Sequence, residues 1–142
     1  MDPKPVRVTI STSIVQSGVK DEYTTGGTGF FYKKGSGVYL QYEEIVEEGS
    51  IRTILKMESG EALLLRSGVV KMRMPLRLGE ETRGSYNTQY GTLPVAAVTD
   101  RLAQGIRENG RGGMFILKYD LQIAGSPAGT YSLTITFEEE NE

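Results

Sequence analysis

The sequence contains no cysteine and no histidine among its 142 residues. Without cysteine there is neither a disulfide framework nor a thiolate nucleophile, and without histidine the most common general base is missing. Zinc sites built from these two residue types and Ser–His–Asp triads are likewise excluded. The composition therefore favours a function that is not enzymatic, and the sequence indicates no catalytic residue, no metal site and no cofactor.

Long apolar runs are also absent. No segment approaches the ~18 apolar residues of a membrane-spanning helix. The opening Met1–Pro5 lacks the apolar stretch of a secretory signal. We therefore expect a cytoplasmic protein without a membrane partner. The net charge of −2 argues against a bulk polyanion as partner.

Apolar and polar residues alternate with a period of two along much of the chain. In Val70–Leu78 every even-numbered residue is apolar, and the odd-numbered ones are basic apart from Pro75. The same alternation occurs in Val6–Ile14 and in Tyr131–Phe137. Because successive side chains of a β-strand point to opposite faces, this pattern predicts an antiparallel sheet with one face on a core.

Glycine-containing turns separate these alternating segments. Ser59-Gly60 and Asn109-Gly110 are typical of two-residue hairpin turns. A turn at Asn109-Gly110 sets Leu102 opposite Leu117 on a shared face. Gly125–Gly129 is expected to close the last hairpin of the chain.

The segment Thr99–Asn109 is compatible with two structures. Leu102 and Ile106 would lie one turn apart in a helix. Gly105 weakens that helix, however, and the Asn109-Gly110 turn needs a partner strand. We favour the strand and keep the helix as the alternative.

The glycine-rich stretch Thr24–Gly29 is the one loop-like segment that suggests phosphate binding. A phosphate-binding loop opens a helix, whereas the residues that follow here, Phe30–Tyr32, have the composition of a strand. We interpret the stretch as a β-bulge or strand kink.

These patterns predict one all-β domain over residues 1–142, with an ordered core at about 5–138 and an acidic C-terminal tail at 138–142. We expect about eight to ten strands. An open sheet of that many short strands would leave long edges bare, so a small antiparallel up-and-down β-barrel is favoured over a sandwich.

Four short motifs carry a resemblance to a known family: Thr28–Tyr32, Arg66–Met72, Tyr86–Gly91 and Tyr119–Leu121. Their order and spacing, from about residue 6 to residue 138, resemble the YwiB-like family of uncharacterised bacterial proteins. The resemblance implies a calycin-like barrel. It implies no activity and transfers no functional residue, because the family has none established.

The interior of such a barrel is the first candidate for function. A barrel of this size is either filled by side chains or has room for one small ligand. We predict non-enzymatic binding of a small, partly apolar molecule, by analogy with other barrels. The tentative lining is Met72, Met74, Phe115, Leu117 and Tyr119.

The basic residues around the same strand are the alternative. Arg66, Lys71, Arg73 and Arg77 lie in a stretch without acidic residues. If the apolar residues of this strand face the core, the basic ones form an outer surface that could bind RNA, another anion or a protein partner. Nucleic acid is therefore not excluded as a partner, although a solubilising surface explains the same pattern.

A further prediction concerns self-association. Paired across the Ser59-Gly60 turn, the flanking segments are apolar on both faces, so that either Ile54, Leu63 and Leu65 or Leu55, Met57 and Leu64 must point outward. A second copy of the chain is the simplest cover, and two-fold dimers are the most common solution. We therefore predict a homodimer.

Overall fold

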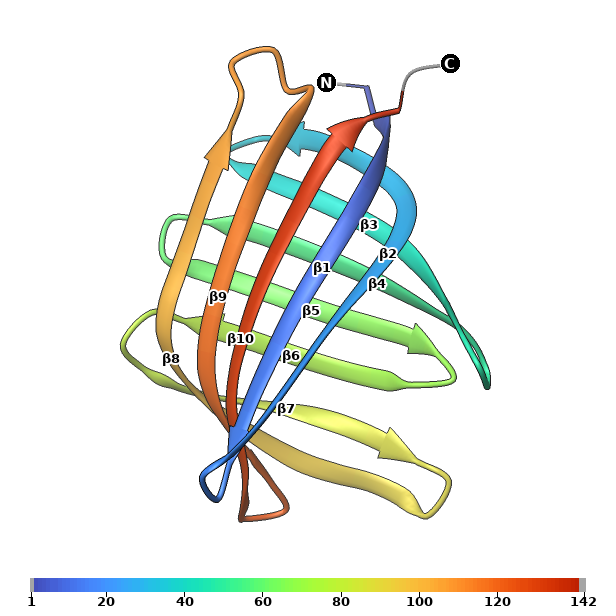
Figure 1. The fold of residues 1–142 in the computed structure, drawn as a ribbon. Helices are drawn as coiled ribbons and strands as arrows, with labels where there is room; N and C mark the ends of the chain where they lie inside the picture. Colours follow the sequence, from blue (N-terminus) through green and yellow to red (C-terminus); the bar gives the residue numbers. More distant parts are fainter. Residues whose placement is uncertain (1, 141–142) are drawn as a thin grey trace.

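The computed structural model describes residues 2–140, and these form ten antiparallel strands joined in one closed barrel (Figure 1). The strands are β1 (Lys4–Gln16), β2 (Val19–Lys34), β3 (Gly37–Val46), β4 (Gly49–Glu58), β5 (Glu61–Gly68), β6 (Lys71–Arg77), β7 (Glu81–Thr88), β8 (Gly91–Ile106), β9 (Gly112–Ile123) and β10 (Ser126–Glu139). Each strand pairs with its neighbour in the chain, and β1 pairs with β10 to close the barrel. The predicted all-β, up-and-down barrel is confirmed.

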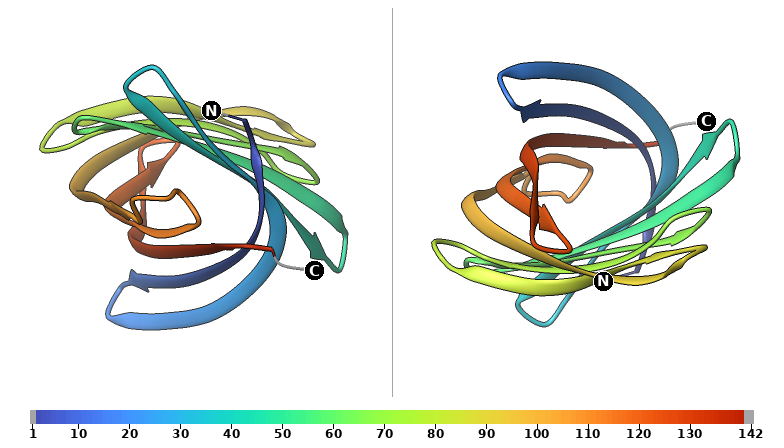
Figure 2. Two further views of the ribbon diagram at one scale, coloured as in Figure 1. Left: turned by 90° about the horizontal axis from the view of Figure 1, so that it is seen from above. Right: turned by 90° about the horizontal axis from the view of Figure 1, so that it is seen from below.

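The up-and-down order places alternate hairpins at opposite ends. Figure 1 shows both chain ends at the top and the β1–β2 and β9–β10 hairpins at the bottom. The hairpins β3–β4, β5–β6 and β7–β8 belong to that second end as well, because strand direction alternates. We call the end with these hairpins the mouth. Figure 2 shows the strands wrapped round a central interior.

Large apolar side chains fill the interior on the side of the chain termini, which we call the packed half. Phe137 stacks on Phe31 with ring centroids 4.5 Å apart, and Phe115 lies 5.9 Å from Phe137. All three rings are fully buried, as are Leu40 and Met74. Their positions follow from the alternation seen in the sequence, since every one of them has the inward parity of its strand.

The turn at Ser59-Gly60 is confirmed as a two-residue turn with positive φ at both residues. At Asn109-Gly110 the predicted register is confirmed, since Leu102 does pair with Leu117. The predicted two-residue turn is wrong, however. Strand β8 ends at Ile106 and β9 begins at Gly112, and only Gly110 of the dipeptide has a positive φ.

The reason lies in the Asn109 side chain. Its Oδ1 accepts a hydrogen bond from the Arg111 backbone N–H at 2.8 Å, and the Gly110 N–H donates to the Arg107 carbonyl at 2.8 Å. Asparagine bonds readily to its own backbone in this way, which favours a longer loop. The predicted pairing of β8 with β9 is nevertheless kept, because the longer loop is also centred on Asn109-Gly110.

The disputed segment Thr99–Asn109 is a strand up to Ile106, so the helix alternative is wrong. A register shift between Thr99 and Arg101 makes Asp100 a β-bulge. The last hairpin turns at Ala124-Gly125, one residue before the predicted stretch, and its irregularity falls between Pro127 and Gly129.

Of the β-bulge or strand kink predicted for Thr24–Gly29, the bulge is absent. Strand β2 pairs with β1 through the whole stretch without a register shift. Glycine is required for a different reason: a β-carbon at Gly27 or Gly29 would overlap the carbonyl oxygen of Glu43 or Gln41 on β3. The backbones of β2 and β3 approach closely here, where the pairing between the two strands begins at Thr28.

The predicted acidic tail is in part sheet. Strand β10 continues to Glu139, and Arg107 and Arg111 form ion pairs with Glu138 and Glu139 at 3.4 and 3.3 Å. Residues 141 and 142 of the predicted tail lie outside the described residues. Between residues 2 and 140 there is no helix long and apolar enough to cross a membrane.

Candidate functional site

A cavity of about 330 Å³ lies inside the barrel towards the mouth. It is not filled by side chains, in contrast to the packed half. Its walls come from nearly every strand: Ile10, Thr12, Ile14, Tyr23, Thr25, Tyr42, Glu44, Thr53, Leu64, Arg66, Val70, Met72, Tyr86, Tyr119, Leu121, Ile123, Tyr131 and Leu133. We call this region the cavity half.

The structure divides the predicted lining residues between the two halves. Met72 and Tyr119 lie on the cavity wall. The other three, Met74, Phe115 and Leu117, have the same inward parity but lie in the packed half. They are 0% exposed and are not part of the lining. Alternation along a strand defines the face of a residue and not its level along the barrel axis.

Arg66 requires a correction. The sequence interpretation grouped it with Lys71, Arg73 and Arg77 on the outer surface, but its side chain lines the cavity. It pairs with Met72 on β6 and shares the parity of Leu64, and both of those face inward. The pairing across the Ser59-Gly60 turn predicts that Arg66 lies on the same face as Leu64. The charge of an arginine side chain, in contrast, favours exposure to solvent.

Glu44 is a cavity residue that the sequence analysis did not identify. It is 8% exposed, and its Oε2 accepts a hydrogen bond from the Thr25 hydroxyl at 2.6 Å. Its Oε1 lies 3.9 Å from Arg66 Nη2, a loose ion pair across the cavity wall. Leu40, Tyr42 and Glu44 alternate along β3, so the same period-two pattern could have placed it inside.

Five tyrosines surround these charges: Tyr23, Tyr42, Tyr86, Tyr119 and Tyr131. Burial, followed by the charge of Glu44, raises the pKa of Tyr42 to about 12. Burial, followed by the neighbouring Tyr131, also raises the pKa of Tyr119. The rings of Tyr119 and Tyr131 stack with centroids 5.6 Å apart. The cavity therefore contains neutral phenols, which can donate hydrogen bonds.

Thr53 contributes a buried hydroxyl to the same wall. It is 1% exposed, and within residues 2–140 its Oγ1 has no hydrogen-bond partner. It lies opposite Tyr42 in the register of β3 and β4, and its nearness to that phenol is the last of the influences on the Tyr42 pKa, which it lowers. Buried polar groups are nearly always paired, so an unpaired one on a cavity wall indicates a position where a ligand or water group can bind.

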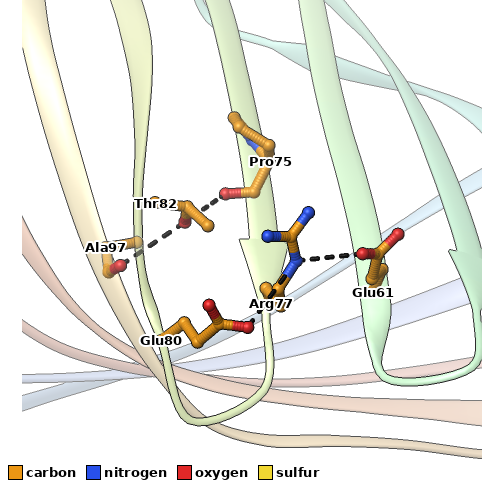
Figure 3. Close-up of polar contacts among 6 residues, drawn as sticks. All are labelled: Glu61, Pro75, Arg77, Glu80, Thr82 and Ala97. Atoms are coloured by element: carbon orange, nitrogen blue, oxygen red, sulfur yellow. Dashed lines mark hydrogen bonds and ion pairs between the residues drawn. The ribbon is translucent and has the colours of Figure 1, made fainter.

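The outer face of β6 carries Lys71, Arg73 and Arg77, as predicted from the alternation. Arg77 Nε lies 2.9 Å from Glu61 Oε1 and 3.8 Å from Glu80 Oε2, so two carboxylates compensate its charge (Figure 3). Lys71 and Arg73 form no ion pair within the described part of the chain. The uncompensated outer charge is smaller than the sequence suggested.

Beside Arg77, strands β6 and β7 separate. Their pairing covers only Lys71 to Arg73 on β6. Beyond it the Thr82 hydroxyl donates a hydrogen bond to the Pro75 carbonyl at 2.5 Å and lies 3.4 Å from the Ala97 carbonyl (Figure 3). A side chain thus connects β6 to β7 where the backbone ladder stops.

The outer face of β4 and β5 carries Ile54, Leu63 and Leu65, each partly buried, while the other apolar set of this strand pair points inward. This settles which of the two sets points outward. Whether a second copy covers it stays a prediction.

Comparisons with known proteins agree with this fold. Residues 8–135 match a family model described as "Domain of unknown function (DUF1934)". The chain is 30% identical over 134 residues to the uncharacterised β-barrel protein YwiB of Bacillus subtilis (strain 168), covering 94% of this chain and 93% of YwiB. The crystal structure of that Bacillus subtilis protein superposes with a TM-score of 0.86 at 29% identity, covering 98% of this chain and 94% of the other. The family resemblance noted in the sequence is thereby confirmed, and the chain belongs to the DUF1934 family of β-barrel proteins.

Proposed function

We propose that this protein binds a small, partly apolar molecule in the cavity half of its barrel and does not transform it chemically. The observation that carries the proposal is the cavity itself, about 330 Å³ within an otherwise tightly packed interior. That volume is at the low end of the ~300–1,000 Å³ typical of ligand pockets. A barrel with a purely structural role gains stability by filling such a space.

The composition of the wall supports the same proposal. Aliphatic side chains such as Ile10, Leu121 and Leu133 alternate with tyrosine rings, and a few polar groups converge among them. Ligand sites typically combine an apolar wall with a small number of placed polar groups. The cytoplasmic location expected from the sequence, which stays a prediction, would expose the cavity to small metabolites.

Titration with N-phenyl-1-naphthylamine, a neutral fluorescent probe of apolar sites, tests the proposal. We expect saturable, blue-shifted fluorescence with the wild-type protein. Met72→Trp places a large ring inside the cavity and should abolish the signal. Ser85→Trp, opposite Arg73 on the outer face, is the matched control and should retain it. Absence of saturable binding to the wild type would contradict the proposed function.

The outer basic face is the second candidate, and it has less support. Arg66 is not part of it, and Arg77 is compensated by Glu61 and Glu80, which leaves Lys71 and Arg73. If it binds RNA, retention on immobilised RNA at low salt should be lost when Lys71, Arg73 and Arg77 are replaced by serine, and it should fall steeply with added salt in the wild type. No retention of the wild type at low salt would exclude this alternative.

A further inference from the structure

The guanidinium of Arg66 has more hydrogen-bond donors than its surroundings use. An arginine carries five N–H donors in a planar fork. Within residues 2–140 the Arg66 side chain makes no hydrogen bond, and its one ion pair, Nη2 to Glu44 Oε1, spans 3.9 Å. The side chain is nevertheless only 31% exposed, inside the cavity half. Its donors are therefore without a hydrogen-bonding protein partner among the described residues, on a side chain that lines the cavity.

Glu44 balances the charge of Arg66 without using its donors. One carboxylate oxygen accepts from Thr25 at 2.6 Å, and the other lies 3.9 Å from Arg66 Nη2, beyond hydrogen-bond distance. The Glu44 side chain is 10% exposed, against 31% for Arg66. The accessible member of the pair is therefore the cation, and the anion serves to hold it in place.

Neutral donors lie in the same wall. The Thr53 hydroxyl, unpartnered and 1% exposed, lies on β4 directly across from Arg66 in the register of β4 and β5. The phenols of Tyr42 and Tyr119 belong to the same wall. A wall with a free guanidinium fork and several hydroxyl donors is complementary to an acceptor with two oxygens.

The charges of the wall limit how negative that acceptor can be. Glu44 and Arg66 are its charged members, so their sum is zero. A monoanion on the Arg66 fork brings the sum to −1, while Glu44 keeps its hydrogen bond from Thr25. A dianion would bring it to −2 in a mostly apolar cavity, which is costlier still, so a single negative charge is the most this wall favours.

From this placement we propose that the ligand of the cavity is a small organic monocarboxylate, with its carboxylate on the Arg66 fork and the Thr53 hydroxyl and its apolar body among the tyrosine and aliphatic side chains. Planar two-oxygen anions match the guanidinium in a bidentate geometry. The inference rests on the proposed function, because it assigns a chemical class to the ligand of that same cavity.

The test compares three probes of equal chain length: octanoate, octanamide and octylamine, each titrated calorimetrically into the wild-type protein. Octanoate should bind at least about tenfold more tightly than octanamide, as expected for a charge-assisted bidentate contact. Octylamine should bind most weakly, because its ammonium faces the accessible guanidinium. Arg66→Lys retains the charge and loses the fork, and it should reduce the preference for octanoate.

A second set of variants separates ligand recognition from folding. Arg66→Met alone leaves Glu44 without its cation and can unfold the barrel. The double variant Glu44→Gln/Arg66→Met removes both charges, so it should stay folded and bind octanoate and octanamide equally. Arg73→Met, on the outer face of β6, is the matched control and should keep the wild-type preference.

The outcomes distinguish the two proposals. Equal binding of octanoate and octanamide by the wild type would overturn the carboxylate inference and leave the proposed function standing. Preference for octylamine, lost in Glu44→Gln, would overturn it in favour of a cationic ligand. Binding of none of the three, together with no binding of the neutral fluorescent probe, would contradict the proposed function itself.

Discussion

The two halves of the barrel interior are built by the same strands and the same alternation, but they are filled differently. In the packed half, Phe137 stacks against both Phe31 and Phe115, and the three rings are buried from solvent. In the cavity half, Glu44 and Arg66 occupy inward positions among tyrosines, and about 330 Å³ stays unfilled. The comparison teaches that alternation alone builds the wall of a barrel, while the side chains at each level decide whether its interior is solid.

This difference has a stability cost. Each inward position of the cavity half that is not filled by an apolar side chain forgoes burial energy, and a charged pair inside a protein seldom recovers its desolvation. Proteins commonly depart from ideal packing at functional sites and compensate elsewhere. In this barrel, the buried apolar side chains of the packed half can supply the stability that the cavity half lacks.

The largest effect is expected from Phe115→Ala in the packed half. Phe115 is 0% exposed and packs against Phe137. Its truncation leaves a void in a dense region and should lower the free energy of unfolding by about 3–5 kcal/mol. Urea unfolding followed by circular dichroism measures this. A loss below about 1 kcal/mol would mean that the packed half is not close-packed.

Two methionines on one strand give a direct comparison of the halves. Met74 is 0% exposed in the packed half, and Met72, two residues earlier on β6, lies on the cavity wall. Met74→Ala should cost about 2–5 kcal/mol, whereas Met72→Ala should cost less than about 1 kcal/mol because Met72 is only partly buried and borders open space, so less packing is lost. Equal losses in the same urea assay would remove the distinction between the halves.

The tyrosines of the cavity half predict a loss of stability at high pH. Tyr42 has its pKa raised from 10.0 to about 12 by burial and by Glu44. As the pH rises above 10, the unfolded chain loses this proton while the folded one keeps it. Stability that is fully present below pH 10 should therefore decline between about pH 10 and 12, by about 2–3 kcal/mol in total. Tyr119 acts in the same direction.

Unfolding midpoints in urea, measured at neutral pH and on either side of pH 10, check this expectation. Tyr42→Phe removes one of the groups and should make the alkaline decline shallower. A decline of the same size in Tyr42→Phe would show that the buried phenol of Tyr42 does not contribute to it.

The smallest effect on the barrel is expected outside it. Leu65 faces outward from β5, opposite Arg73, so Leu65→Glu should change the free energy of unfolding by about 0.5 kcal/mol or less. If the predicted homodimer uses this face, the same substitution should convert a dimer mass to a monomer mass in light scattering. A wild-type monomer at every concentration would contradict the homodimer.

Much of the fold was predictable because strand alternation and hairpin turns are local. The parity of Met72, Met74, Phe115 and Leu117 followed from neighbouring residues, and so did the register around Asn109. The turn geometry at Asn109 was missed because it depends on a side-chain hydrogen bond that competes with the two-residue turn.

The candidate site was less predictable, for two physical reasons. Which residues share a level inside a barrel depends on strand tilt and stagger, and period-two alternation contains no information about either. In addition, the residue type of Arg66 predicts exposure to solvent, because a buried charge needs a partner, and its partner Glu44 lies on β3, two strands earlier in the chain. The pairing becomes visible only after the barrel is closed.

The closure of the barrel between β1 and β10 has a consequence for how the chain folds. Val6 pairs with Glu139, so one edge of the first strand has no partner until the last strand has been synthesised. Chains dominated by contacts between distant residues fold slowly, because the loop entropy is lost before those contacts form. On the ribosome, we therefore expect the nascent sheet to stay open along the β1 edge until β10 has emerged, and refolding of the released chain to be limited by the docking of that final strand.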